Sequence, residues 1–416
     1  MVAGIRAGLG AEGLMRRRTF IRSAGLVIGG APLGAVVGKQ AAPSDRVGIG
    51  VIGTGVRGQQ LIGYLRELAD FEIVACCDEL DFRLAEGGEL AGPQAKRYAD
   101  YRALLDDRDV DAVIVATPFY HHARAALDAL DAGKHVYCEK TMTKGTADTR
   151  RVLRAARAAG LSFQTGLQFH YAPVYAAAVE MIRGGELGQV AAVNCQWNRN
   201  GDWRRPVPDP ALERKINWRM YREYSGGLAA ELCAHQMNFC NQIIAGNVDT
   251  ISGVGGVDFW RDGRETYDNI QLTCRYDSGV TASFESLTSN SLGRYRITVL
   301  GNKGSLELTF GKGWYYPEVA GEAVPEGLDL VSGASVDGAQ GAYRLADTRN
   351  SYAVDAPEME PTLPALAAFA RAIRDGRQPE MGVEAGAKVA MMVQMGLDAM
   401  DRERVLHRSD GYRLDG

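Results

Sequence analysis

The chain has 416 residues, of which 46% are hydrophobic and 24% charged, enough for two or three ordinary globular domains. Its formal net charge of -4 argues against nucleic acid as the main partner, because proteins that bind nucleic acid usually carry a basic excess. The 50 glycines show no collagen-like period and favour a loop-rich α/β protein.

A basic segment followed by an apolar one stands near the N-terminus. Residues 16–22 read RRRTFIR, and residues 24–38 are mostly small or apolar. This apolar stretch is too short for a transmembrane helix, which needs about 20 residues, and it fits an export signal. Arg17 and Arg18 resemble the paired arginines of the twin-arginine translocation motif. An ordinary basic helix is the alternative, which the glycines disfavour. We interpret residues 1–42 as a twin-arginine signal and expect the translocation machinery as a partner and export to the periplasm.

The seven cysteines are odd in number and show no paired CxxC spacing. Neither a disulfide framework nor a zinc site is therefore indicated. Several lie in apolar stretches, where a buried, inert thiol is the usual role. We assign no metal.

Residues 45–165 alternate apolar runs with helical stretches. The runs VGIGVI, FEIVACC, DAVIVATP and HVYCEK are almost continuously hydrophobic, which is typical of parallel strands covered on both faces. This pattern predicts an N-terminal Rossmann domain, a doubly wound parallel sheet of the α/β class.

The pattern changes near residue 166. The segments AAVNCQWN, DTISGVGGVDF, NIQLTCRY, VTASFESL, YRITVLG and SLELTF contain more polar residues and are joined by hairpin signals. They predict a C-terminal α/β domain over residues 166–360 with a large, mostly antiparallel open sheet. Residues 333–360 are typical of a surface loop. Residues 361–416 return to a helical pattern, and we expect these helices to pack back on the Rossmann domain.

Residues 53–58 form a GxGxxG motif that directly follows an apolar strand and opens a helix. In this context the first glycine permits a tight turn, the second lets the backbone approach a pyrophosphate, and the third allows close packing of helix and strand. We assign phosphate binding to Gly53, Thr54, Gly55, Val56, Arg57 and Gly58.

Asp78 stands 20 residues after Gly58, at the end of the next apolar run. A carboxylate there can accept hydrogen bonds from the adenosine ribose and repels a 2'-phosphate, so NAD is favoured over NADP. The alternative is a glycine turn with a fortuitous acidic residue after the next strand.

Five further motifs follow in order. They are ATPFYHH at 116–122, AGKHVYCEKT at 132–141, GLQFHYAP at 166–173, IRGGELGQV at 182–190 and INWRMYREYSGGLAAELCAH at 216–235. Through them the chain resembles the glucose-fructose oxidoreductase and inositol dehydrogenase superfamily (Gfo/Idh/MocA). The resemblance implies a Rossmann domain, an open-sheet domain that often mediates oligomerisation, and hydride transfer to or from a sugar or polyol. We accordingly expect a homo-oligomer formed through the C-terminal sheet.

The resemblance also implies roles for individual residues. Lys140 matches the lysine of the family's Glu-Lys-Pro signature, Glu139 its acid, and His235 the histidine that serves as acid or base. Thr141 replaces the usual proline, often found in cis, so the turn is expected to differ. Glu231 precedes His235 by one helical turn and is expected to orient it; a solvated helical pair is the alternative.

Further contacts follow from the same motifs. The expected cofactor-binding residues outside the glycine turn are Asp78, Thr117, Pro118, His122, Glu139, Lys140, Gln168, Trp218 and Arg219, although His122 also suits a helix cap. The substrate candidates, for which a core or loop role is about equally plausible, are His170, Tyr171, Trp203, Arg204 and Tyr224.

The leading hypothesis is an NAD-dependent oxidoreductase acting on a hydroxyl or ketone of a sugar, sugar derivative or cyclitol. One alternative is an NAD-dependent enzyme that cleaves a glycoside through a transient keto-sugar, and another is a catalytically silent cofactor-binding protein. Because no reliable pool of free NAD exists beyond the cytoplasmic membrane, an exported enzyme is expected to hold its NAD tightly.

Overall fold

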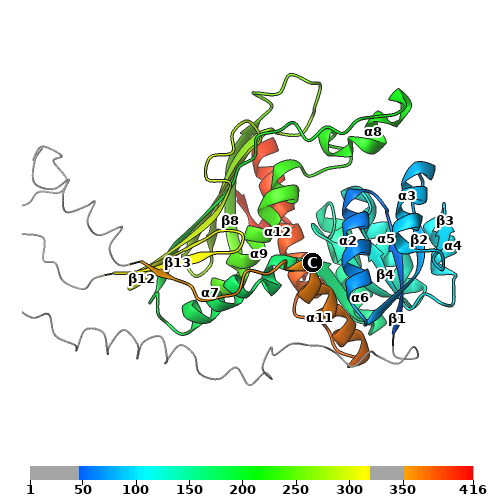
Figure 1. The fold of residues 1–416 in the computed structure, drawn as a ribbon. Helices are drawn as coiled ribbons and strands as arrows, with labels where there is room; N and C mark the ends of the chain where they lie inside the picture. The colour runs from blue at the N-terminus through cyan, green and yellow to red at the C-terminus, as the bar shows by residue number, and fades with distance from the viewer. Residues whose placement is uncertain (1–45, 319–350, 416) are drawn as a thin grey trace, which may run out of the picture. The chain divides into compact units, whose positions relative to one another are not determined.

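The computed structural model describes residues 46–318 and 351–415, and Figure 1 draws the remaining segments in grey. The predicted export signal, 1–42, and most of the predicted loop, 333–360, therefore lie outside the described residues. All described residues belong to one unit of the chain.

The first half of the chain forms the expected parallel sheet. Its six strands lie in the order β3-β2-β1-β4-β5-β6, and each pairs in parallel with its neighbours. They are β1 (Val47–Ile52), β2 (Phe71–Cys77), β3 (Lys96–Tyr98), β4 (Ala112–Val115), β5 (His135–Glu139) and β6 (Phe163–Gly166). The strands after β1 are added towards one edge of the sheet as far as β3, and those from β4 onward are added towards the other edge. This strand order confirms the Rossmann prediction.

Helices cover both faces of this sheet because successive strand residues point to opposite sides and both sets are apolar. Ile49 and Val51 pack on one face with α2 (Val56–Glu67) and α11 (Thr362–Arg374). Val113 and Val115 pack on the other with α4 (Tyr101–Leu105), α5 (His122–Asp131) and α6 (Thr146–Ala159). Helix α3 (Asp81–Ala91) packs beside α2 and β2.

The second half of the chain forms a nine-stranded sheet in the order β14-β13-β12-β11-β7-β10-β9-β8-β15. Its strands are β7 (Val190–Trp197), β8 (Val248–Gly256), β9 (Asn269–Tyr276), β10 (Thr281–Leu287), β11 (Tyr295–Gly301), β12 (Gly304–Leu308), β13 (Gly313–Pro317), β14 (Tyr352–Ala353) and β15 (Leu406–His407). All pairs are antiparallel except β7 with β10. The predicted mostly antiparallel open sheet is confirmed.

One face of this sheet carries the core of the domain. Along β9 every second residue is buried, which is typical of a sheet covered on one side only. The buried residues pack against α7 (Pro173–Arg183), α9 (Ala234–Ile243) and α12 (Val383–Asp401), the helices that lie along the sheet in Figure 1.

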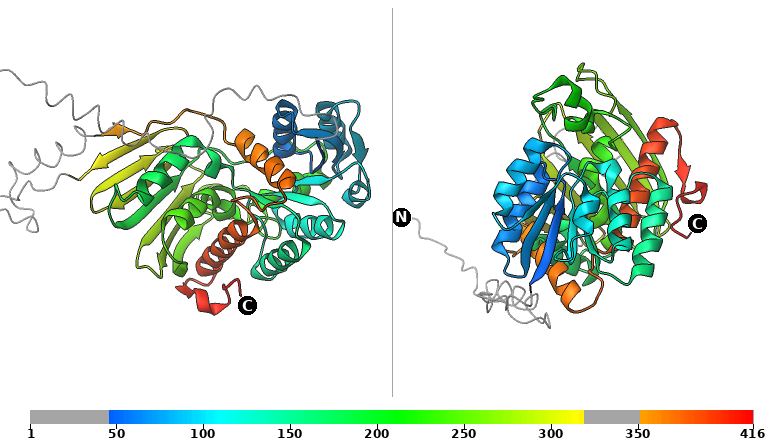
Figure 2. Two further views of the ribbon diagram at one scale, coloured as in Figure 1. Left: turned by 90° about the horizontal axis from the view of Figure 1, so that it is seen from below. Right: turned by 90° about the vertical axis from the view of Figure 1, so that its right-hand side faces the viewer.

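The C-terminal segment joins the two sheets. Helix α11 contacts α2, while α12 lies beside α6 and also packs on β8 (Figure 2). Met391, Met392 and Met395 of α12 are buried. Five short strands were not expected. Strands β3 and β6 form the two edges of the parallel sheet, β13 pairs with β12, β14 falls within the predicted loop and pairs with β13, and β15 extends the second sheet beside β8.

All seven cysteines are buried and none forms a disulfide. Over the described ranges, no set of three or more His, Cys, Asp and Glu side chains is arranged to hold a metal ion. No helix in the same ranges is long and apolar enough to cross a membrane.

Candidate active site

A cleft of about 360 Å³ opens where the carboxyl ends of the parallel strands face the second domain. The predicted residues that line it are Gly53, Gly55, Val56, Arg57, Asp78, Thr117, Pro118, His122, Glu139, Lys140, Gln168, Trp203, Trp218, Arg219, Glu231 and His235. In a doubly wound sheet, ligands bind at this edge, at the point where the strand order reverses.

The glycine turn between β1 and α2 is packed as its motif requires. Gly53 has a φ of 94°, and a Cβ there would lie 2.8 Å from the main chain of Ala116, after β4. A Cβ on Gly58 would lie 1.9 Å from the carbonyl oxygen of Gly53, whereas Gly55 has no atom nearer than 3.6 Å. The first and third glycines therefore bring backbone segments together, and the second leaves an open approach for a phosphate group.

Asp78, directly after β2, is buried beside this turn. One carboxylate oxygen accepts a hydrogen bond of 2.9 Å from the Thr54 amide, and the other accepts one of 3.0 Å from the Leu80 amide. Burial raises the pKa of Asp78, although these two amides oppose the shift. The carboxylate is therefore fixed at the rim of the cleft, where the ribose was expected to bind.

Three buried polar atoms of the cleft residues have no hydrogen-bond partner among the residues that the structure describes: Thr117 Oγ1, Gln168 Oε1 and His235 Nδ1. Buried polar groups normally have partners, so such atoms indicate a ligand or ordered water. Together with the open glycine cradle, they fit a nicotinamide dinucleotide, which Gly55 and its neighbours would hold at the phosphates and Asp78 at the ribose.

Lys140 follows β5 and crosses the cleft to the second domain. Its Nζ donates a hydrogen bond of 2.8 Å to the main-chain carbonyl oxygen of Glu231. Burial lowers the pKa of Lys140, with the carboxylates of Glu231 and Glu139 opposing the shift. A half-buried lysine with a lowered pKa, at the carboxyl-terminal edge of a parallel sheet, is a suitable proton donor or acceptor.

Glu231 lies in a π-helix, Ala229–Cys233, immediately before α9. Such bulges are frequent at functional sites. The Glu231 carboxylate accepts a hydrogen bond of 2.8 Å from Nε of Arg219. Burial pushes the pKa of Glu231 upward, but Arg219 and Lys140 outweigh it and the net shift is downward. The expectation that Glu231 orients His235 is therefore wrong, because the Glu231 carboxylate is bound to Arg219.

His235 is held by stacking instead. Its ring lies 4.3 Å from the ring of Phe169 at an interplanar angle of 21°. The side chain is 4% exposed, and burial, followed by the charges of Lys140 and Arg57, lowers its pKa well below 6.5. His235 is therefore a neutral imidazole at pH 7 and can accept a proton.

Glu139 connects the glycine turn to Lys140. Its carboxylate accepts hydrogen bonds from Nε of Arg57, at 2.8 Å, and from the Lys140 amide, at 3.2 Å. Arg57 also lies 3.5 Å from Thr362 Oγ1, at the start of α11. Arg57, which was expected to contact the cofactor, thus also stabilises the segment that contains Glu139 and Lys140.

The turn after Lys140 departs from two expectations. The peptide bond between Lys140 and Thr141 is cis, so the geometry attributed to proline is present with threonine. His122 does not cap its helix: its ring nitrogens lie 2.9 Å from the carbonyl oxygens of Thr141 and Thr117. These bonds tie the ends of β4 and β5 together behind the cleft.

Of the substrate candidates, only Trp203 lines the cleft. The others face partners that sequence spacing does not reveal. His170 bonds to Gln242 and Glu380, both at 2.7 Å. Arg204 pairs with Asp262 and Glu213, Tyr224 packs on Tyr120 and Arg214, and Tyr171 has its hydroxyl buried outside the cleft. We therefore withdraw these four as direct substrate contacts.

The cleft also contains side chains that the motifs did not single out. The principal ones are Arg83, Phe169, Trp197, Arg199 and Arg205. The WRR sequence at 203–205 is a signal that could have drawn attention to Arg205.

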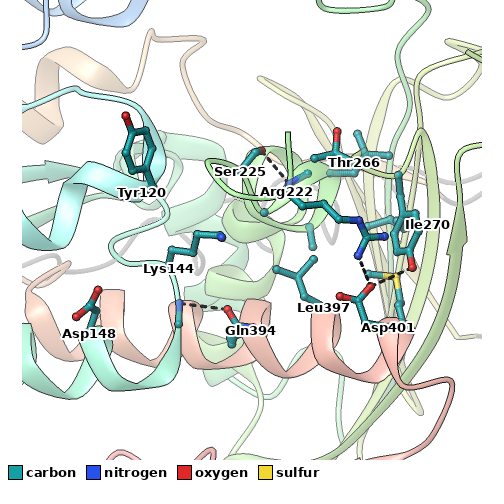
Figure 3. Close-up of a pocket in the computed structure, with 17 residues that line it drawn as sticks. Tyr120, Lys144, Asp148, Arg222, Ser225, Thr266, Ile270, Gln394, Leu397 and Asp401 are labelled. Carbon is teal, nitrogen blue, oxygen red and sulfur yellow. Dashed lines mark hydrogen bonds and ion pairs between the residues drawn. The ribbon is translucent and has the colours of Figure 1, made fainter. Parts of the chain in front are cut away.

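A second cavity, of about 490 Å³, lies behind the segment that leads to Glu231 (Figure 3). Gly226 to Ala229 line it, whereas Glu231 and His235 line the cleft. Lys144 points into the cavity, and the Arg222 guanidinium pairs with Asp401 on its wall. The Lys144 Nζ donates to the carbonyl of Glu223. The described lining of this cavity includes none of the predicted site residues.

The fold and the cleft define a dinucleotide-binding oxidoreductase. Family models confirm this: residues 47–167 match the oxidoreductase family with an NAD-binding Rossmann fold, and residues 175–307 match the GFO/IDH/MocA C-terminal domain. The chain therefore belongs to the Gfo/Idh/MocA family of oxidoreductases.

Relatives include an inositol 2-dehydrogenase of Salmonella typhimurium, 35% identical over 35% of this chain and 44% of its own length. A 2,7-anhydro-N-acetylneuraminate hydratase of Escherichia coli is 25% identical over 63% of this chain and 67% of its own. Among solved structures, levoglucosan dehydrogenase with NADH and levoglucosan has a TM-score of 0.69 at 18% identity, covering 87% of this chain and 99% of its own. An aldose-aldose oxidoreductase of Caulobacter crescentus has a TM-score of 0.69 at 21% identity, over the same shares.

Proposed function

We propose that this protein is an NAD-dependent oxidoreductase that transfers a hydride to or from a carbon bearing a hydroxyl or ketone in a sugar, sugar derivative or cyclitol. The observation that carries the proposal is the meeting of Lys140, Glu231 and His235 in the cleft that contains the glycine cradle. The names of the relatives, inositol 2-dehydrogenase and levoglucosan dehydrogenase, support the substrate class.

His235 and Lys140 have different roles in the proposed reaction. A bound nicotinamide would accept or supply the hydride. His235 is neutral at pH 7, because its pKa lies well below 6.5, and it is therefore free to accept the hydroxyl proton of an alcohol. Lys140 hydrogen-bonds the oxygen that becomes the carbonyl, and the Glu231 carbonyl positions its ammonium group.

The direct test uses purified protein, NAD and a panel of sugars and cyclitols. We expect at least one compound to raise the nicotinamide absorbance at about 340 nm, and His235→Ala to abolish the change. Intact NAD binding with no reaction on a broad panel, in either direction, would count against the proposal.

A second candidate rests on one relative, which is named a hydratase rather than a dehydrogenase. In such a case the sugar would be altered without net change in nicotinamide absorbance. Mass spectrometry of the same reaction mixtures separates the two functions. A new product without net absorbance change supports the hydratase- or lyase-type reaction.

We further propose that the protein prefers NAD to NADP. The buried carboxylate of Asp78 at the ribose position supports this preference, since it would repel a 2'-phosphate. Arg83, which lines the same end of the cleft, is the side chain that would favour a phosphate instead.

Export through the twin-arginine pathway is also a proposal, and its support is the RRRTFIR sequence at 16–22. In cells expressing the full chain we expect the protein in the periplasm, and the double variant Arg17→Lys, Arg18→Lys in the cytoplasm. Protein purified without added cofactor should contain close to one nicotinamide dinucleotide per chain. Cofactor-free protein after gel filtration would contradict tight retention.

Self-association through the nine-stranded sheet is the last part of the proposal. One face of the sheet packs on helices, while residues of the other face, such as Gln271 and Thr273 of β9, are exposed. We expect a multiple of the 45.0 kDa chain mass in light scattering, and a smaller species after Thr273→Arg. A monomeric unmutated protein would refute the proposal.

A further inference from the structure

We propose that the substrate carries an anionic group, a carboxylate or a phosphate, and that Arg199 and Arg205 bind it. This inference rests on the proposed function and specifies its substrate class. It follows from the distribution of charge in the cleft, from the way one loop presents its arginines, and from the position of that loop beside His235.

Positive side chains outnumber carboxylates among the described residues of the cleft. Six cations line it: Arg57, Arg83, Lys140, Arg199, Arg205 and Arg219. The carboxylates are Asp78, Glu139 and Glu231, of which Glu139 pairs with Arg57 and Glu231 with Arg219. Arg199 and Arg205 have no carboxylate within ion-pair distance among the described residues. A charge excess of this kind concentrates anions in a narrow cleft.

Arg199 lies just beyond the end of β7. Its amide donates to the carbonyl oxygen of Leu287, which fixes the backbone to the neighbouring strand β10. Its guanidinium lies 5.6 Å from the ring of Trp203. Partial burial and the nearby charges of Arg205 and Arg219 lower the pKa of Arg199. An incoming anion would relieve this repulsion.

Arg204 and Arg205 are neighbours with different roles. Arg204 pairs with Asp262 and Glu213 and therefore braces the loop. The backbone of Arg205 is clamped by Asn217, whose Oδ1 accepts from the Arg205 amide at 2.7 Å and whose Nδ2 donates to its carbonyl at 3.2 Å. The main chain of Arg205 is thus fixed, while its side chain lines the cleft.

Trp203 provides an apolar surface beside Arg199. Its φ is 66°, a conformation that bulky residues rarely adopt and that is more common at functional sites. Arg264 holds the preceding residue by donating to the carbonyl of Asp202 at 2.9 Å. An aromatic ring beside a guanidinium group suits a sugar ring bearing a negative charge.

The position of this loop indicates that the anion belongs to the substrate and not to the cofactor phosphates. Trp197, two residues before Arg199, has its ring 6.1 Å from that of His235. The glycine turn that would hold the pyrophosphate follows β1, on the Rossmann side.

The test compares matched sugars that differ only in charge: a hexose, its uronic acid, the methyl ester of that acid, and the hexose phosphate. The variants are Arg199→Gln and Arg205→Gln, with Arg183→Gln on α7 as the control, since Arg183 is exposed and outside the cleft. Each protein is loaded with NAD, and kcat/KM and the calorimetric Kd are measured for every compound.

We expect the charged sugars to be preferred over their neutral partners by at least about 10-fold, the lower end of the scale for a hydrogen bond to a charged group, because both arginines are exposed. Either cleft variant should remove most of this preference, whereas Arg183→Gln should keep it. Comparison of the uronic acid with the hexose phosphate shows whether the site binds a carboxylate or a phosphate.

Equal binding of neutral and charged sugars would overturn the inference. So would a loss of NAD affinity in the Arg199 and Arg205 variants with an unchanged preference between sugars. If charged sugars bind in calorimetry but none changes the nicotinamide absorbance or is converted, the anion site stands and the proposed function fails.

Discussion

The Nζ of Lys140 donates a 2.8 Å hydrogen bond to the main-chain carbonyl oxygen of Glu231, 91 residues later in the chain. This bond joins the end of the Rossmann strand β5 to the π-helix of the second domain. Since the Glu231 carboxylate is bound to Arg219, one residue positions Lys140 through its backbone and a cleft arginine through its side chain.

Lys140→Met should lower kcat by at least about 100-fold, because it removes the hydrogen bond to the reacting oxygen while retaining most of the side-chain volume. Lys144→Met is a matched control, since Lys144 also donates to a main-chain carbonyl, that of Glu223, but lines the second cavity. Steady-state kinetics and thermal melting check both variants. Near-normal turnover of Lys140→Met would show that the reacting oxygen lies elsewhere.

Glu231→Gln should reduce kcat/KM by about 10-fold, less than Lys140→Met, because the Glu231 carbonyl still holds Lys140. Arg219→Gln should have a similar effect, since both changes break the 2.8 Å pair. The double variant should be little worse than either single one, because contacting residues show non-additive effects. A double-mutant cycle on kcat/KM measures this coupling, and additive losses would mean that the pair does not act as a unit.

The activity of the enzyme should persist below pH 6.5. The pKa of His235 lies well below this ordinary value because of burial and the charges of Lys140 and Arg57. The base is therefore neutral at pH 7, and activity should fall only when the pH passes through the lowered pKa. The pH profile of kcat/KM checks this, and a half-maximal point at or above pH 6.5 would contradict it.

The same shift predicts a change in stability. Below about pH 6.5 an unfolded histidine binds a proton while buried His235 does not, so the free energy of unfolding should fall as the pH falls through this window, until the folded pKa is reached. Each such group contributes at most about 1.4 kcal/mol per pH unit. His122, also buried with a lowered pKa, adds to the slope. Denaturant titrations at several pH values give the free energy of unfolding as a function of pH. For His235→Gln this free energy should change less steeply with pH than for the unmutated protein.

Asp78→Ser should narrow or invert the preference for NAD over NADP, because it removes the charge that would repel a 2'-phosphate and leaves Arg83 close by. It also removes an acceptor for the amides of Thr54 and Leu80. Asp78→Asn therefore serves as the control that keeps an acceptor oxygen. Calorimetric Kd values for both cofactors decide, and tighter binding of NADP by the unmutated protein would show the assignment to be wrong.

The sequence by itself determined the two sheets and the main residues of the cleft. Continuous apolar runs such as 47–52 can only be buried on both faces, and alternating runs such as 269–276 on one face. The GxGxxG turn and Asp78 are local signals, because each is defined by its place after one strand. Short strands such as Tyr352–Ala353 escaped prediction because main-chain pairing with β13, and not a side-chain pattern, forms them.

Only the tertiary structure decided which partner each polar side chain takes. Spacing brings Glu231 near His235 on one helix, yet Arg219 arrives from an earlier segment and binds the carboxylate. Arg204 and Arg205 are adjacent residues of the same type, so the sequence does not distinguish their roles. In the structure Asp262 forms an ion pair with Arg204. Ion pairs depend on distances of a few ångströms between segments far apart in the chain, so the folded chain, and not residue spacing, leaves Arg205 in the cleft with no carboxylate partner in the described part of the chain.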